Sequence, residues 1–142
     1  MHTTPSTTIT STDDAGKLLL RVVLAILLLF HGVSKLSGGI GFIGGMLQAA
    51  GLPAFFGYGV YIGEVVAPLL ILVGLFTRPA ALVVAVNMVV AVLLAHTGQI
   101  FTLSDTGGWA LELQGMFLAG ALAVALLGAG RFSLGGAGGR FN

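Results

Sequence analysis

Residues 58–97 read YGVYIGEVVAPLLILVGLFTRPAALVVAVNMVVAVLLAHT, and this stretch decides the fold. Two apolar runs, residues 58–76 and 79–97, flank a short polar turn at Thr77-Arg78-Pro79. Each run has about 20 residues, enough as a helix to cover the roughly 30 Å hydrocarbon core of a bilayer. Because lipid offers no partner for open backbone groups, both runs are predicted to be transmembrane helices joined as a hairpin.

Two further apolar runs lie outside this hairpin, at residues 18–36 and 109–128. The sequence therefore predicts an all-α integral membrane protein, a four-helix antiparallel bundle with short connections. We expect a disordered tail at residues 1–16, a transmembrane domain at 17–130 and a Gly-rich tail at 131–142. Residues 40–50 are predicted to form a short interfacial helix or a re-entrant cover.

Composition supports the membrane class. Charged residues make up 8% of the 142 residues and hydrophobic residues 56%, and the mean hydropathy is +1.05. So short a soluble chain has no core large enough to bury that much apolar surface. The net charge of +1 gives no indication of nucleic-acid binding. The absence of Cys excludes disulfides, thiolate metal ligands and thiol redox chemistry.

The basic residues predict the orientation. With the N-terminus inside, one side of the membrane holds five of them: Lys17, Arg21, Arg78, Arg131 and Arg140. The other side holds only Lys35, so both termini are predicted to be cytoplasmic. Trp109 then falls at the outer interface. Arg21, near the inner end of its span, is expected to extend toward the headgroups.

Five ionisable residues fall inside the spans or at their ends: His31, Lys35, Glu64, His96 and Glu112. The predicted topology brings all five into one layer in the outer half of the bundle. His31 and Lys35 are four residues apart and share a helix face. Because charge at membrane depth is costly, such residues usually mark a site, and we predict one polar cluster.

Pro68 and two glycines shape the surroundings of Glu64. Pro68 has no N–H to donate to the Glu64 carbonyl four residues back, so we expect a kink with a free carbonyl beside the carboxylate. Gly59 and Gly63 form a GxxxG pair that permits close helix approach. Asn87, in the middle of its span, is expected to make an interhelical hydrogen bond.

Several chemistries suit these residues. His31, Glu64, His96 and Glu112 are able to bind a metal, although the Glu-x-x-His signature of di-iron bundles is absent. A haem between His31 and His96 is another reading. A third is a quinone whose carbonyls accept hydrogen bonds while a His–Glu pair moves protons. In the simplest interpretations these residues only hydrogen-bond the helices to one another, and the Lys35 side chain extends to the membrane interface.

The same residues carry a resemblance to a known family. The order LLLRVVLAILLLFHGVSKL, GEVVAPLLILVGLFTRPAAL, a His closing the third span, a Glu opening the fourth and GAGRFSL resembles the DoxX family over about residues 17–134. Its members are small four-helix proteins of the bacterial inner (plasma) membrane, similar to the small subunit of thiosulfate:quinone oxidoreductase. The family pattern falls here on His31, Lys35, Glu64, Arg78, His96 and Glu112.

The resemblance implies a multi-pass subunit of a membrane oxidoreductase system with membrane or periplasmic protein partners. We expect a quinone or similar ligand in the outer half, with His31 and His96 hydrogen-bonding it, Glu64 and Glu112 relaying protons, and Lys35 attracting an anionic form. A partner would donate the electrons, since the sequence has no electron-carrying motif. The alternatives are a metal or small-molecule carrier and a structural scaffold. Gly-rich faces also permit a homo-oligomer.

Overall fold

The computed structural model describes residues 11–142. Within that range the chain is helical, and β pairing is limited to one bridge between Leu103 and Trp109. The α-helices are α1 (Ser11–Gly38), α2 (Gly41–Ala49), α3 (Gly59–Tyr61), α4 (Ala67–Val73), α5 (Thr77–Ala95) and α6 (Glu112–Leu127). Between them lie the 3-10 turns η1 (Ala54–Tyr58) and η3 (Thr97–Gln99) and the π turn η2 (Ile62–Val66).

Three of these stretches are long and apolar enough to cross a membrane: Thr12–Gly38, Ala54–Val73 and Thr77–Ala95. The middle stretch is one continuous rod made of η1, α3, η2 and α4. The predicted all-helical fold with membrane-spanning helices is therefore confirmed. The fourth apolar helix, α6, is shorter, with 16 residues.

The start of α6 corrects the predicted fourth span, which was drawn from residue 109. The helix begins only at Glu112, because the preceding backbone groups pair within the connection from α5. The amide of Ala110 donates to the Thr102 carbonyl over 3.0 Å, and the Trp109 indole donates to the Ile100 carbonyl over 2.7 Å. Trp109 thus holds the loop between α5 and α6 together instead of opening the helix.

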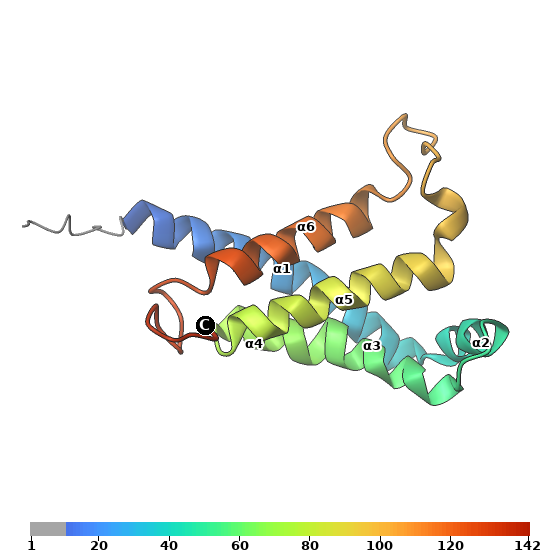
Figure 1. The fold of residues 1–142 in the computed structure, drawn as a ribbon, viewed down its shortest axis with the longest axis horizontal. Coiled ribbons are helices and arrows are strands. Elements are labelled where there is room, and N and C mark those ends of the chain that lie inside the picture. The colour runs from blue at the N-terminus through green and yellow to red at the C-terminus, as the bar shows by residue number, and fades with distance from the viewer. Residues whose placement is uncertain (1–10) are drawn as a thin grey trace, which may run out of the picture.

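The long helices pack side by side around one apolar core. α1 packs against α4 and α6, and α5 packs against the same two helices (Figure 1). Each helix contributes a fully buried residue to the shared core, among them Leu28, Ile71, Val84 and Ala121. α2 and the loop between α5 and α6 lie at the end of the molecule opposite the C-terminal residues (Figure 1).

The turn between α4 and α5 lies earlier than predicted. α4 ends at Val73 because Gly74 adopts a left-handed conformation (φ 75°), which brings the Leu75 amide to the Leu70 carbonyl over 3.0 Å. α5 begins at Thr77, so the predicted turn residues 77–79 form its first turn. Pro79 is tolerated there because its missing N–H has no helical acceptor at that position.

The other end of the molecule is closed by residues 128–142, here called the C-terminal segment. Arg21 is buried inside it, and its guanidinium donates to four carbonyls, those of Ile71, Leu72, Ala129 and Phe132. The expectation that Arg21 extends toward the headgroups is therefore wrong. It is drawn inward because α4 ends with free carbonyls beside it.

The start of α1 depends on the same segment. Asp14 is buried and accepts a hydrogen bond from the Arg131 amide over 2.9 Å. α1 therefore begins at Ser11 rather than near residue 18. Part of the predicted disordered tail, residues 11–16, is helical, and its first ten residues lie outside the described range.

Candidate functional site

Glu64 lies on the π turn η2, in the middle of the second rod. The wide turn is shown by the Ala67 amide, which donates to the Ile62 carbonyl five residues back. Pro68 follows immediately and offers no N–H to the Glu64 carbonyl, so an ordinary helical bond is missing there. The distortion expected from Pro68 takes the form of this π turn. The freed Glu64 carbonyl faces Gly32 of α1, where a Cβ would overlap it.

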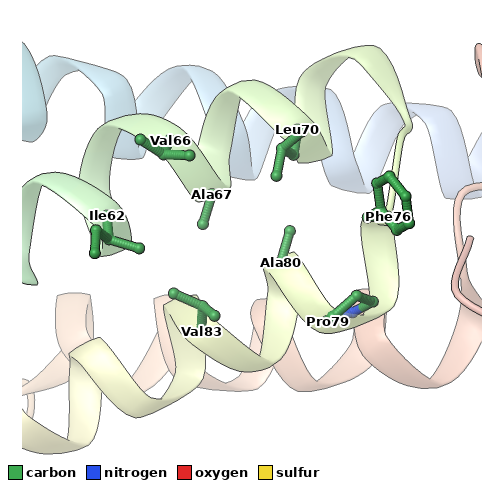
Figure 2. Close-up of a pocket in the computed structure, with 8 residues that line it drawn as sticks. All are labelled: Ile62, Val66, Ala67, Leu70, Phe76, Pro79, Ala80 and Val83. Carbon is green, nitrogen blue, oxygen red and sulfur yellow. The ribbon is translucent and has the colours of Figure 1, made fainter.

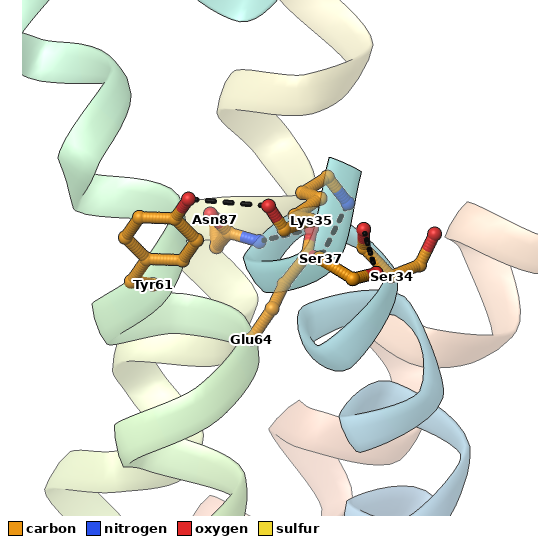
Figure 3. A network of polar contacts seen from close by, with 6 residues as sticks. All are labelled: Ser34, Lys35, Ser37, Tyr61, Glu64 and Asn87. Atoms are coloured by element: carbon orange, nitrogen blue, oxygen red, sulfur yellow. Dashed lines mark hydrogen bonds and ion pairs between the residues drawn. The ribbon is translucent and has the colours of Figure 1, made fainter. Parts of the chain in front are cut away.

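The Glu64 carboxylate is buried, with 6% of the residue exposed, and it is bound by two side chains from different helices. The Lys35 ammonium of α1 pairs with its Oε2 atom. The Asn87 amide of α5 donates to its Oε1 atom over 3.3 Å. Figure 3 shows the three side chains converging from three helices. We call this group the Lys35–Glu64–Asn87 cluster.

Tyr61 closes one side of the cluster by donating its hydroxyl to the Lys35 carbonyl over 3.2 Å (Figure 3). The Lys35 side chain is 29% exposed, whereas that of Glu64 is 7% exposed. The carboxylate of the cluster is therefore buried, whereas its ammonium is partly exposed. The alternative in which Lys35 extends alone to the interface is not the observed conformation.

Asn87 makes the interhelical hydrogen bond that its mid-span position predicted, and the acceptor is Glu64. Its side chain lies directly on Gly63, where a Cβ would overlap it. Gly59, by contrast, has no neighbour within 4 Å of the place a Cβ would take. The expected GxxxG pair therefore does not act as a unit.

The two histidines lie outside hydrogen-bonding contact with this cluster. His31 is exposed one turn before Lys35, and its ring meets that of Phe117 edge-on with centroids 5.7 Å apart. His96 closes α5, with Nδ1 2.9 Å from Gln99 Oε1 and Nε2 3.4 Å from the Gln114 amide. Both of its ring nitrogens face glutamine side chains.

Glu112 is exposed in the first turn of α6, with its carboxylate against Gly108. The five predicted residues therefore do not form one hydrogen-bonded group: Lys35 and Glu64 meet, and the other three lie apart. In the described part of the chain, no three His, Asp or Glu side chains are grouped closely enough to hold a metal ion. The set His31, Glu64, His96 and Glu112 is thus not assembled as a metal site.

Sequence reasoning did not identify two residues that contact the cluster, and it left the partner of a third open. Tyr61 and Gly32 were not singled out, and Asn87 was expected to make an interhelical hydrogen bond without a named acceptor. Asn87 carried a usable signal, since it is the one strongly polar residue within residues 79–95. Gly32 carried none, because its role depends on the Glu64 carbonyl of another helix.

An apolar hollow on the surface does not coincide with the cluster. It is an apolar groove of about 230 Å³ between α4 and α5 (Figure 2). Ile62 and Val66 line it, and in helical spacing these residues point away from Glu64 on the same rod. No titratable side chain lines the groove, so it has no side chain that could accept or release a proton.

Comparison with known proteins gives two matches. The family model described as DoxX matches residues 16–97, which include Lys35, Glu64 and Asn87. A curated protein of Bacillus subtilis (strain 168), named "Putative oxidoreductase CatD", is 34% identical over 80 residues. That match covers 56% of this chain and 59% of the relative, so it spans less than two thirds of the relative's length. No solved structure matches.

Proposed function

This chain belongs to the DoxX family, and we propose that it is the membrane subunit of an oxidoreductase system that binds a quinone or a similar small aromatic redox molecule at the Lys35–Glu64–Asn87 cluster. The family and its oxidoreductase-named relative support a membrane role associated with oxidoreductases. The proposed setting is the bacterial inner membrane, crossed by a four-helix bundle with both termini cytoplasmic. The excess of Lys and Arg at the end that carries the C-terminal segment supports this orientation.

One observation carries the proposal: a buried carboxylate lies on a π turn in the middle of a helical stretch long and apolar enough to cross a membrane, and it pairs with a partly exposed ammonium. A buried ion pair adds little net stability compared with apolar residues of the same size. π turns inside α-helices are frequent at functional sites. The pair is therefore better explained by chemistry than by holding the helices together.

The donor set of the cluster fits a ligand with carbonyl oxygens. The Lys35 ammonium has three N–H donors, and its bond to Glu64 uses one of them. The Asn87 amide supplies a second donor from the opposite helix. Glu64 is the group able to accept or release a proton next to both donors. A bound quinone would supply the two-electron redox chemistry that the side chains lack.

The remaining predicted residues have supporting roles in this proposal. His31 lies on the Lys35 face of α1 and is exposed, so it is suited to exchange protons between the cluster and the surroundings. His96 and Glu112 lie at the same end of the molecule, on either side of the loop between α5 and α6. We assign them to proton delivery at the surface. A partner protein supplies the electrons.

The test is the quinone content of gently purified protein, measured by extraction and mass spectrometry. Wild type should carry quinone, and Glu64→Gln and Asn87→Leu should lose most of it while remaining folded. Asp105→Asn, the same carboxylate-to-amide change in the exposed loop before α6, is the matched control and should keep the wild-type content. Quinone absent from all samples, or lost equally in the control, would reject the proposal.

A further inference from the structure

Two apolar grooves meet at Phe76, on the face of the molecule formed by α4 and α5. The first is the 230 Å³ hollow already described, here called the α4–α5 groove (Figure 2). Ala67 and Ala80 point toward each other across its floor, and their small side chains leave the space unfilled (Figure 2). Both helices belong to stretches able to cross a membrane, so we expect this groove to face hydrocarbon.

The second groove, here called the end groove, holds about 200 Å³ between the α4–α5 turn and the C-terminal segment. Leu75 and Phe76 line one side, and Gly135, Gly139 and residues 140–142 line the other. Arg140 is the one charged residue in its lining, and its guanidinium lies 5.7 Å from the centre of the Phe141 ring. An apolar hollow with a cation at its rim suits the junction between an acyl chain and an anionic headgroup.

Hydrogen bonds fix both walls of the end groove. The Leu134 and Gly135 amides donate to the Val73 and Gly74 carbonyls over 3.0 and 2.9 Å. Farther along the segment, the Thr77 hydroxyl donates to Asn142 Oδ1 over 2.9 Å. The groove therefore belongs to the folded structure and needs no rearrangement to accept a ligand.

Phe76 joins the two grooves at a strained position. Its φ of 47° and ψ of 39° make it the one non-glycine residue with positive φ in the described range. A bulky residue in this conformation is a genuine outlier, and such strain persists only where the surroundings impose it. The side chain is nevertheless 61% exposed and lines both hollows. Its position therefore shapes a surface rather than filling the core.

The charges at this end favour an anionic ligand. Arg131 is paired with Asp14, but within residues 11–142 no carboxylate lies at ion-pair distance from Arg140. Arg21 and Arg78 are engaged with backbone carbonyls. Arg140 is thus an exposed cation without an acidic partner in the described chain, next to an apolar groove. Guanidinium groups match phosphate oxygens in geometry.

We propose that the two grooves form a binding site for one anionic phospholipid. An acyl chain lies along the α4–α5 groove, and the phosphate binds Arg140 at the mouth of the end groove. The occupant is a lipid rather than a protein because the first groove opens on the hydrocarbon face. This site is separate from the Lys35–Glu64–Asn87 cluster, and the lipid proposal does not depend on the quinone proposal.

The test uses the full chain in nanodiscs of equal parts phosphatidylglycerol and phosphatidylcholine with identical acyl chains. Lipid retained after mild detergent extraction is counted by native mass spectrometry. Wild type should retain phosphatidylglycerol over phosphatidylcholine by about fivefold, the preference expected of one basic residue near an anionic headgroup. Arg140→Gln should abolish this preference. Arg131→Gln, which removes the other Arg–Phe pair of the segment, is the matched control and should keep it.

A second variant tests the apolar half of the site. Val83 lines the α4–α5 groove and is exposed, so Val83→Phe fills the groove without entering the core. It should lower the retained lipid of both kinds at an unchanged melting temperature. Equal loss of preference in Arg131→Gln and Arg140→Gln would show diffuse charge attraction and overturn the proposal. Displacement of phosphatidylglycerol by an equal amount of long-tailed quinone would also overturn it.

Discussion

Two buried charges are stabilised in opposite ways: Arg21 lies beside the C-terminal segment, and Glu64 lies in the middle of the second rod. Arg21 is 2% exposed and is surrounded by backbone carbonyls from α4 and the C-terminal segment. Glu64 is 6% exposed and is bound by the side chains of Lys35 and Asn87. The carbonyls around Arg21 cannot change their charge, whereas the partners of Glu64 can move and one of them is itself ionised. This contrast is why the proposed ligand site is placed at Glu64 and not at Arg21.

The largest effect is expected at the carbonyl-bound charge. Arg21→Met removes the donor to four carbonyls and detaches the C-terminal segment from α4. We expect a loss of roughly 3–5 kcal/mol in the free energy of unfolding, since several buried acceptors lose their partner together. Denaturant unfolding in detergent measures it. Quinone content per folded molecule should not change. A selective loss of quinone would show that Arg21, like Glu64, contributes to ligand binding.

The next effect concerns the ion pair. Lys35→Met leaves the Glu64 carboxylate without its counter-charge and should lower the unfolding free energy by about 2–4 kcal/mol, less than for a fully buried pair because Lys35 is partly exposed. The double variant Lys35→Met/Glu64→Met should regain most of that stability, because both charges are then gone. It should still lack quinone. A stable double variant that retained the quinone would show that the pair is only structural.

The sequence was sufficient for three of the spans and for the helix distortion beside Glu64. Apolar runs of sufficient length fix membrane helices almost without reference to packing, which is why three stretches were predicted within a few residues, apart from the early start of α1. Pro68 likewise predicts a local distortion, because proline lacks a backbone N–H in any conformation. These are properties of single segments, and single segments can be read from sequence.

What sequence reasoning could not supply depended on contacts between distant segments. Arg21 was misplaced because its acceptors lie 50 to 111 positions away along the chain. His96 and Glu112 were grouped with Glu64 by depth alone, yet depth does not fix which way a helix is rotated about its axis. The π turn changes that rotation for every residue beside it. Depth can be predicted from hydropathy, whereas rotation is set by packing.

A smaller effect sharpens the account of the π turn. In Gly32→Ala the new Cβ would overlap the Glu64 carbonyl and the Val65 side chain, so α1 must move away. We expect a loss of about 1–3 kcal/mol in unfolding free energy from overpacking, together with weaker quinone retention. Gly59→Ala is the matched control, because open space surrounds that position. It should be neutral or slightly stabilising through helix propensity, and equal damage from both substitutions would contradict the assigned contact.

The smallest effect is expected where the basic partner of a charge pair is mostly exposed. Arg131 Nε lies 3.4 Å from Asp14 Oδ2, and the Arg131 side chain is 58% exposed. Arg131→Gln keeps the amide that donates to Asp14, so the helix start retains its main hydrogen bond. The cost should stay below about 1 kcal/mol and should shrink further in salt, since solvent screens such pairs. Melting temperatures at low and high ionic strength measure both. A salt-independent loss as large as that of Arg21→Met would mean that the guanidinium of Arg131, rather than that of Arg21, holds the C-terminal segment in place.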